Sequence, residues 1–178
     1  NLKNREEVKK KLESMGCFFS SELHQIDHIF IPEGVSFPPP ITTPVLRVRN
    51  QNDKYFFTLK ISQSGRQDSI ERELEINDGA MMIEILKLLK WRETIIVDKK
   101  RIKTNLQDVE IVLDDVKDLG DFIEAEKITT NENSEDRKKI QDELCGFLET
   151  LGVAKEDLLV NHKYDIMLND IYSKFGVK

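Results

Sequence analysis

The pattern of hydrophobic and polar positions divides the chain into helical repeats near its two ends and short alternating runs between them. Val8, Leu12 and Met15 recur at helical spacing behind Asn4, which opens a capping-box pattern. This spacing predicts a helix over 4–15, with the Asn4 side chain capping its first turn.

The middle of the chain indicates β-structure, because runs rich in Val, Ile, Phe and Thr alternate with Pro, Gly, Asn and Asp turn signals. The connections between consecutive runs are short, which favours antiparallel pairing. Seven strands are predicted, over 23–31, 44–49, 55–61, 69–76, 93–103, 109–114 and 121–128.

Helical periodicity interrupts these strands once and returns after them. The apolar segment 77–91 predicts a helix packed on the outside of the sheet. Two more helical segments are predicted over 134–151 and 157–175. Because the chain has no internal repeat and no linker rich in Gly or Ser, the pattern predicts one α+β domain over residues 1–178.

Composition narrows the class of protein. The 178 residues carry 27 Lys and Arg against 33 Asp and Glu, a net charge of −6, which argues against a nucleic-acid polymer as partner. The longest apolar run, 80–89, contains two charges and is too short to cross a membrane, and no signal peptide opens the sequence. We therefore expect a cytoplasmic protein without a membrane partner, in which Cys17 and Cys145 are small buried side chains.

Charge lies along the predicted strands in blocks of one sign. Because neighbouring side chains of a strand point to opposite faces, residues two apart share a face. Cations mark one face of the second, third and fifth strands, and carboxylates mark one face of the fourth, sixth and seventh. The cations are Arg47, Arg49, Lys60, Lys99, Arg101 and Lys103, and the carboxylates are Glu71, Glu73, Glu75, Asp114, Glu124 and Glu126.

Two interpretations of these blocks remain open. A charged stripe is ordinarily the solvent-exposed face of a sheet whose other face packs on helices. A solvent face, however, usually mixes both signs with Thr, Ser and Gln, whereas like charges two residues apart repel and need a partner. The blocks therefore also fit the interior of a closed antiparallel barrel that binds a charged ligand.

A polyphosphate bound together with a divalent cation would explain both signs. Arg side chains match phosphate oxygens in pairs, Lys supplies point charges, and carboxylates need a cation between themselves and phosphate. Oxygen ligands of this kind suit Mg²⁺ or Mn²⁺ and are poor ligands for Zn²⁺. The residues thus indicate phosphoryl chemistry, which depends mainly on positioning and charge neutralisation.

Several short motifs keep a fixed order along the chain: Gln25-x-Asp27, Leu46-Arg47-Val48-Arg49, Thr58-Leu59-Lys60, Glu73-Leu74-Glu75, Lys99-x-Arg101, Asp114 and Gly120-Asp121-Phe122-Ile123-Glu124-Ala125-Glu126. In this order they resemble the CYTH superfamily of triphosphate tunnel metalloenzymes, which includes class IV adenylyl cyclases, thiamine triphosphatases and inorganic triphosphatases. The resemblance implies an α+β fold with a closed or nearly closed antiparallel eight-stranded β-tunnel and flanking helices.

Two departures from the family pattern change what we expect. The first strand of the family, with the pattern Glu-x-Glu-x-Lys ahead of the first helix, is absent from this chain, and we expect the native protein to contain it. Without that strand, one edge of the tunnel would be open. Ile29 and Thr104 stand where many members have a Tyr, so a Tyr–Lys pair is not expected to act as the base.

The resemblance also implies the role of each charged residue. Lys60 and Lys99 are the predicted catalytic residues. Gln25 and Asp27 are predicted to support them at the tunnel mouth, although a surface position fits Asp27 equally well. Triphosphate binding is predicted for Arg47, Arg49, Lys60, Lys99, Arg101 and Lys103, and binding of Mg²⁺ or Mn²⁺ for Glu73, Glu75, Asp114, Glu124 and Glu126.

Three functions remain open on this basis. The first is metal-dependent hydrolysis of inorganic triphosphate or of an organic one such as thiamine triphosphate. The second is a class IV adenylyl cyclase that forms cyclic AMP from ATP, and the third is a non-catalytic module that binds polyphosphate or nucleotide. We favour hydrolysis, because it requires only a phosphate clamp, a metal and water. The expected partner is a small-molecule triphosphate or nucleotide, and the expected state is a monomer or homodimer.

Overall fold

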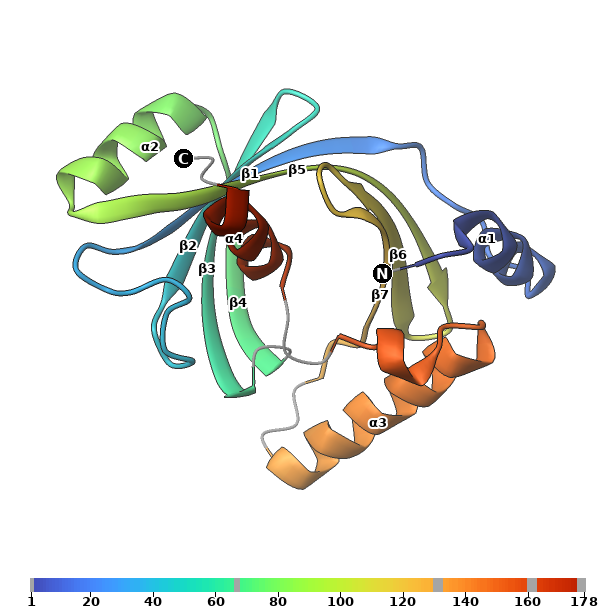
Figure 1. Cartoon of the computed structure of the whole chain (residues 1–178). Helices are drawn as coiled ribbons and strands as arrows, with labels where there is room; N and C mark the ends of the chain where they lie inside the picture. Colours follow the sequence, from blue (N-terminus) through green and yellow to red (C-terminus); the bar gives the residue numbers. More distant parts are fainter. Residues whose placement is uncertain (1, 66–67, 130–132, 160–162, 176–178) are drawn as a thin grey trace. The chain divides into compact units, whose positions relative to one another are not determined.

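The structure, a computed structural model, describes residues 2–65, 68–129, 133–159 and 163–175. These residues contain four α-helices, seven strands and one 3₁₀ helix (Figure 1). In chain order the elements are α1 (Arg5–Ser14), β1 (Leu23–Pro32), β2 (Val45–Gln51), β3 (Lys54–Gly65), β4 (Asp68–Ile76), α2 (Gly79–Leu88), β5 (Trp91–Leu106), β6 (Val109–Val116), β7 (Gly120–Glu126), α3 (Ser134–Thr150), the 3₁₀ turn η1 (Lys155–Asp157) and α4 (Tyr164–Phe175).

The α+β class and the seven predicted strands are confirmed. The strands form one sheet in the order β4-β3-β2-β1-β5-β6-β7. Pairing is antiparallel between β1 and β2, β2 and β3, β3 and β4, and β6 and β7. The described residues therefore hold seven strands, where the family resemblance implies a tunnel of eight.

The chain forms two compact units. Unit 1 consists of Asn1–Leu23 and Lys100–Leu159, and unit 2 consists of His24–Lys99 and Val160–Lys178. The long strand β5 runs from unit 2 into unit 1. A single domain over residues 1–178 stays a prediction.

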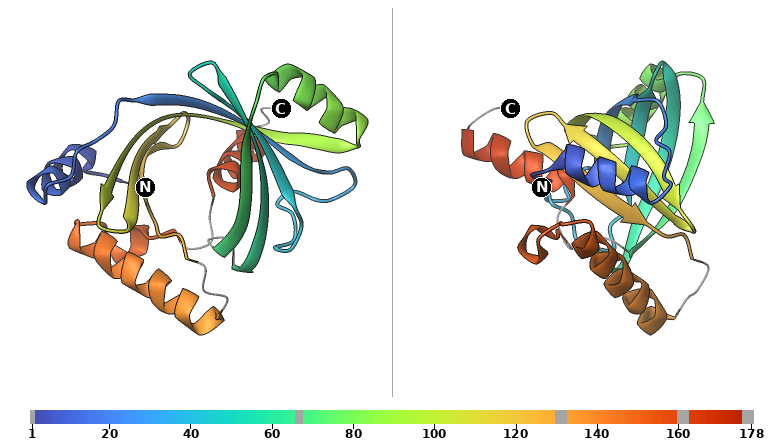
Figure 2. Two further views of the ribbon diagram at one scale, coloured as in Figure 1. Left: turned by 180° about the vertical axis from the view of Figure 1, so that it is seen from behind. Right: turned by 90° about the vertical axis from the view of Figure 1, so that its right-hand side faces the viewer.

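Unit 2 places α2 on one face of its strands and α4 on the other (Figures 1 and 2). On the α2 side, Phe30 and Leu46 from the strands pack with Leu86 of the helix in an apolar core. The opposite face carries charged residues, and there the ring centroid of Tyr164 in α4 lies 5.3 Å from the Lys99 amine. The strands of unit 2 thus have one apolar and one charged face, as alternation requires.

Unit 1 divides its strands in the same way. Helices α1 and α3 lie beside β6 and β7 (Figure 2). Leu12 of α1 and Leu151, which follows α3, belong to one core cluster with Ile111 and Leu113 of β6. Asp114 follows Leu113 directly, so its side chain lies on the opposite face of β6 from this core.

The predicted side-chain cap of one helix and the predicted end of another are wrong. Helix α1 begins after Asn4, but the Asn4 side chain makes no capping hydrogen bond. Helix α2 ends at Leu88 rather than at residue 91, because Lys90 adopts a left-handed conformation with a φ of 65° and Trp91 begins β5. A Lys at this position does not predict a left-handed turn, because the residue that adopts this conformation after a helix is usually Gly or Asn.

The C-terminal part also differs from the prediction. The segment predicted as one helix over 157–175 contains the end of η1, an extended Leu158 and then α4, while residues 160–162 lie outside the described ranges. Cys17 is buried as predicted, whereas Cys145 is only partly buried. None of the helices in the described ranges is long and apolar enough to cross a membrane.

Candidate functional site

The charged face of unit 2 is built by the antiparallel register of β1 to β4. This register lines up side chains of neighbouring strands in rows across the sheet, and cross-strand neighbours in a row are close enough to interact. Each of three rows combines one cation with at least one carboxylate. The rows are Asp27–Arg49–Phe56–Glu75, Ile29–Arg47–Thr58–Glu73 and Val45–Lys60–Glu71.

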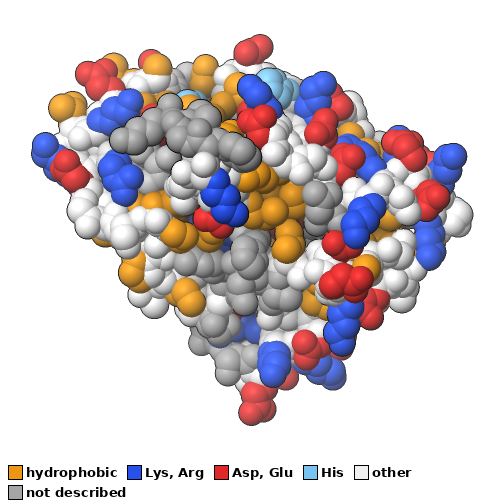
Figure 3. Space-filling view, viewed as in Figure 1, with side chains coloured by type: hydrophobic (Ala, Val, Ile, Leu, Met, Phe, Trp, Pro, Cys, Tyr) orange, Lys and Arg blue, Asp and Glu red, His pale blue; other side chains and the backbone are white. Residues whose placement is uncertain are grey.

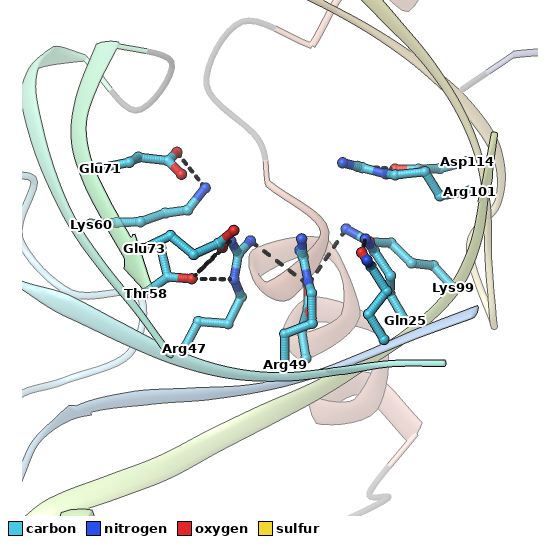
Figure 4. Close-up of polar contacts among 12 residues, drawn as sticks. Gln25, Arg47, Arg49, Thr58, Lys60, Glu71, Glu73, Lys99, Arg101 and Asp114 are labelled. Atoms are coloured by element: carbon cyan, nitrogen blue, oxygen red, sulfur yellow. Dashed lines mark hydrogen bonds and ion pairs between the residues drawn. The ribbon is translucent and has the colours of Figure 1, made fainter. Parts of the chain in front are cut away.

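Asp27 is the point at which three cations of this face meet. Arg49 donates from Nε to Oδ1 of Asp27 (2.6 Å) and from Nη2 to Oδ2 (2.8 Å), a bidentate pair. The Nζ of Lys99 lies 3.5 Å from Oδ2, and Nη1 of Arg47 lies 3.9 Å from the same oxygen. The Asp27 side chain is 4% exposed. One buried carboxylate therefore contacts three cations, whose heads approach one another in Figure 4.

Opposing effects act on the pKa of Asp27. Burial by itself raises the pKa, because it disfavours the charged form of a carboxyl group. The charges of Lys99, Arg47 and Arg49, together with the hydrogen bonds from Arg49, outweigh burial and hold the pKa of Asp27 well below its usual range. Asp27 is therefore a permanent negative charge at the centre of the cations.

Arg47 and Lys60 have further carboxylate partners on β4. Nη2 of Arg47 donates to Oε2 of Glu73 (3.0 Å) and to Oγ1 of Thr58 (3.1 Å), and the Thr58 hydroxyl donates to Oε2 of Glu73 (2.7 Å). Nζ of Lys60 lies 2.5 Å from Oε1 of Glu71. Burial raises the pKa of Glu71, but the charge and hydrogen bond of Lys60, together with the charges of Arg47 and Lys163, outweigh burial and lower it.

Unit 1 carries a second set of charged residues, on β5, β6 and β7. Arg101 donates from Nε to Oδ1 of Asp114 (2.7 Å) and from Nη2 to Oδ2 (2.5 Å), and its Nη2 also donates to Oε2 of Glu124 (2.8 Å). Asp114 is fully buried. Lys103 pairs with Glu110 at 3.0 Å. In unit 1, two carboxylates thus neutralise one arginine.

The residues predicted from the sequence fall into these two groups. Unit 2 brings Arg47, Arg49, Lys60 and Lys99 together with Glu73, while Glu75 lies exposed at the end of the Arg49 row. Unit 1 brings Arg101 together with Asp114 and Glu124, and it places Lys103 with Glu110; Glu126 pairs in register with Glu110. Their roles toward phosphate and metal stay predictions.

Burial decides between the two interpretations of the charged stripes. Arg49, Lys99 and Arg101 are at most 7% exposed, so for them the solvent-exposed interpretation is wrong. Glu71 and Glu73, with side chains 44% and 42% exposed, fit that interpretation. On the face seen in Figure 3, side chains of both signs lie side by side, which is the ordinary arrangement of a solvated surface.

Three polar residues of unit 2 have contacts that the sequence did not reveal. Asp27 is central rather than superficial, and Thr58 joins Arg47 to a carboxylate. Gln25 donates to Oε1 of Gln51 (2.6 Å), and its own Oε1 is buried with no hydrogen-bond partner among the described residues. The available signal was a Gln and an Asp two apart in one strand, which places both on one face.

Carboxylates of the right chemistry for Mg²⁺ or Mn²⁺ are present, but those nearest the cations accept hydrogen bonds from arginine. Asp114 and Glu124 accept from Arg101, and Glu73 accepts from Arg47. Within the described ranges, no three His, Cys, Asp or Glu side chains form a group that could hold a metal ion. As arranged, these carboxylates fit the orientation of arginines and do not fit a metal shell.

Comparison with known proteins agrees with the motif order. Residues 2–160 match the CYTH domain. A relative named "Putative adenylate cyclase MJ0240", from Methanocaldococcus jannaschii, is 28% identical over 160 residues, which are 89% of each chain. Two Pyrococcus horikoshii OT3 structures have a TM-score of 0.74: PH1012 protein, at 30% identity over 92% of this chain and 93% of its own, and PH1819 protein, at 25% over 93% of each. The chain therefore belongs to the CYTH family of triphosphate tunnel proteins.

Proposed function

We propose that the protein is a metal-dependent hydrolase of a triphosphate, either inorganic triphosphate or an organic one such as thiamine triphosphate. The observation that carries the proposal is the gathering of Arg47, Arg49, Lys60 and Lys99 on one face of unit 2 (Figure 4). Four cations in one place match an anion whose charge is spread over three phosphate groups. Membership of the CYTH family supports a triphosphate as that anion.

In this proposal the cations bind and orient the phosphates. Arg47 and Arg49 hold phosphate oxygens, while Lys60 and Lys99 are the catalytic residues that neutralise charge developing on the transferred and leaving oxygens. Water attacks the terminal phosphorus, the bond to the bridging oxygen breaks, and orthophosphate and the diphosphate leave. For Arg101 and Lys103 of unit 1, phosphate binding stays an expectation of the family resemblance.

A divalent cation, Mg²⁺ or Mn²⁺, belongs to the proposal through the family. When bound, such an ion neutralises phosphate charge. The family resemblance implies Glu73, Glu75, Asp114, Glu124 and Glu126 as its ligands, but as arranged within the described ranges these carboxylates form no group that could hold the ion. Glu124→Gln tests this implied role: a metal concentration for half-maximal activity about tenfold above that of wild type would make Glu124 a ligand despite its hydrogen bond from Arg101. An unchanged titration would remove Glu124 from this set, and Asp108→Asn, an exposed carboxylate of the same unit, serves as the control.

One assay tests the proposal. The protein is incubated with tripolyphosphate, thiamine triphosphate and ATP, each with Mg²⁺ and with Mn²⁺, and orthophosphate release is measured separately from cyclic nucleotide formation. We expect orthophosphate from at least one triphosphate. Binding without any turnover would support a non-catalytic module instead.

Variants connect the activity to unit 2. Arg47→Ala and Lys60→Ala should each lower kcat/KM by about 10²-fold or more, because each removes a charge that neutralises phosphate. Arg72→Ala is the matched control, since this arginine of β4 is exposed and alternation places it on the opposite face from Glu71 and Glu73. Full activity of an Arg47→Ala, Lys60→Ala double variant would contradict the proposal.

One observation favours adenylyl cyclase activity as a second candidate: the name of the Methanocaldococcus jannaschii relative. In that reaction the ribose 3′-hydroxyl of ATP attacks the α-phosphorus and diphosphate leaves, so the same cations would hold the leaving group. Formation of cyclic AMP without release of orthophosphate would replace the hydrolase proposal.

A further inference from the structure

We infer that Asp27 is a positioning residue, which fixes the heads of Arg47, Arg49 and Lys99 so that phosphate groups meet them in one arrangement. The inference rests on the proposed function, because it concerns the same cations of unit 2. Asp27 itself does not bind the substrate, since an ionised carboxylate repels phosphate.

The first step is the sharing of one anion by several cations. The carboxylate of Asp27 is engaged at both oxygens by Arg49 and at Oδ2 also by Lys99 and, more distantly, by Arg47. Cations brought together where water is excluded repel one another strongly. A buried anion between them offsets this repulsion and gives each head a preferred direction.

The second step is the difference in burial between Asp27 and the other carboxylates of this face. The side chains of Glu71 and Glu73 are 44% and 42% exposed, so a phosphate arriving from solvent can replace them on Lys60 and Arg47. The Asp27 side chain is 4% exposed and is enclosed by its partners. Asp27 therefore stays in place when an anion binds, whereas the two glutamates are exchangeable.

The third step concerns Lys99, which is held from two sides. Its amine lies 3.5 Å from Asp27 and 5.3 Å from the centroid of the Tyr164 ring, within the range of a cation–π interaction. The Lys99 side chain is 5% exposed. A lysine has a long flexible stem, so a fixed amine needs such restraints. Loss of Asp27 would remove one of these restraints.

Charge alone and positioning predict opposite effects of Asp27→Asn. If Asp27 acted only through its charge, its removal would make the site more positive and would tighten the binding of every phosphate anion. If Asp27 positions the cations, its removal lets their heads spread, and a displacement of about 1 Å lowers turnover by about 10²-fold. The direction of the change therefore separates the two explanations.

The experiment compares wild type, Asp27→Asn and Asp27→Glu. We measure kcat and KM for the triphosphate that wild type hydrolyses, and dissociation constants for tripolyphosphate and orthophosphate by calorimetry. We expect Asp27→Asn to lower kcat about 10²-fold and to lower the preference for tripolyphosphate over orthophosphate about tenfold. Asp27→Glu keeps the charge but moves it, so it should also lose kcat. Tighter binding with unchanged kcat would overturn the inference.

Glu93→Gln is the matched control. Glu93 of β5 pairs with Nδ1 of His28 at 2.6 Å, and alternation places His28 on the opposite face of β1 from Asp27. This variant removes a carboxylate from a hydrogen-bonded pair on neighbouring strands, away from the proposed site. Its kcat and its preference for tripolyphosphate should equal those of wild type.

The outcomes also separate this inference from the proposed function. If wild type binds tripolyphosphate but hydrolyses no triphosphate, the proposed reaction is wrong. The inference is then tested by binding alone, as the preference of Asp27→Asn for tripolyphosphate over orthophosphate compared with that of wild type. If wild type is active and Asp27→Asn keeps wild-type kcat, only the inference fails. Thermal melts accompany every variant. Should neither Asp27 variant melt cooperatively, Asp27 acts in folding and the positioning role is overturned.

Discussion

Asp27 stays ionised although it is buried, and this links the stability of unit 2 to pH. A carboxyl group whose pKa is lower in the folded than in the unfolded protein binds fewer protons when folded. Its contribution to stability is fully present above the unfolded pKa, which is about 3.9 for Asp. The contribution is lost as the pH falls below that value toward the folded pKa.

The first prediction follows from this loss of stability at low pH. Asp27→Asn should lower the free energy of unfolding by about 3 kcal/mol or more at neutral pH, since it leaves buried cations without their partner. The difference from wild type should shrink as the pH falls below about 4. Urea denaturation over a pH series measures it. Leu86→Ala removes no titrating group, so its difference should be the same at every pH, and a constant difference for Asp27→Asn would contradict the prediction.

Single residues also show the limit of what the sequence could predict. The common face of Arg47 and Arg49 follows from alternation, because a side-chain period of two is a property of any strand. The central place of Asp27 does not follow, since its neighbours Ile26 and His28 fit an exposed strand as well as a buried one. Burial of this position depends on side chains from strands distant in sequence, among them Lys99 of β5, whose amine contacts both Asp27 and the Tyr164 ring of α4.

Helix α2 begins at a close contact between backbone and ring. Asp78 caps the helix by accepting a hydrogen bond from the backbone N of Met81 (2.9 Å). At the next position, Gly79, an added Cβ would lie 2.3 Å from Cδ1 of Tyr55 in β3, closer than any van der Waals contact. A glycine is therefore required where the helix starts against the strand.

The second prediction compares two glycines in helices. Gly79→Ala should destabilise the protein by about 1–3 kcal/mol, because the new methyl group displaces the Tyr55 ring. At Gly146, inside α3, an added Cβ would meet no atom within 4 Å beyond the helix's own backbone, so Gly146→Ala should stabilise by about 0.5–1 kcal/mol. Thermal and urea denaturation of both variants measure the effects. A change of the same sign in the free energy of unfolding of both variants would contradict the role of Tyr55.

Strands proved more predictable than helix ends. Every predicted strand overlaps an observed one, because turn residues such as Gly34 and Asp53 mark the ends of alternating runs. The end of α2 was missed because apolar residues continue through Leu89 to Trp91 while the backbone already turns at Lys90. Hydrophobic periodicity reports which face is buried, and it does not report the backbone conformation of a single residue.

At the scale of the whole molecule, a net charge of −6 opposes the binding of anions. The cations of unit 2 act locally, because charges separated by more than about 8 Å of physiological saline are largely screened from one another. In the proposed function, affinity for a triphosphate therefore depends on the arrangement around Asp27 and not on the average charge. For the same reason, composition alone excluded only polymeric polyanions.

The third prediction concerns ligand binding to the folded chain. Tripolyphosphate at a hundred times its dissociation constant should stabilise the protein by about 2.7 kcal/mol, measured as a higher melting temperature. Arg47→Ala should remove most of this shift, whereas Arg72→Ala should keep it. Sulfate at the same ionic strength is the control for salt effects, and an equal shift with sulfate would contradict specific binding of the triphosphate.

The motif order was sufficient to predict the family, which the match of the CYTH domain to residues 2–160 confirms. The division into two units could not be predicted, because β5 crosses from one to the other without a linker or a change of composition. The boundary between two compact units is defined by contacts between residues distant in sequence. When one strand continues across that boundary, the sequence contains no signal of its position.

The carboxylate common to three cations has a consequence for protein engineering and for natural divergence. Replacing Arg49 alone would also change the interactions of Lys99 and Arg47 with the shared carboxylate of Asp27. The effects of substitutions in this group on stability and activity will therefore not add. A change of anion specificity would therefore have to alter several members together, and libraries that vary one position at a time would find mostly inactive proteins.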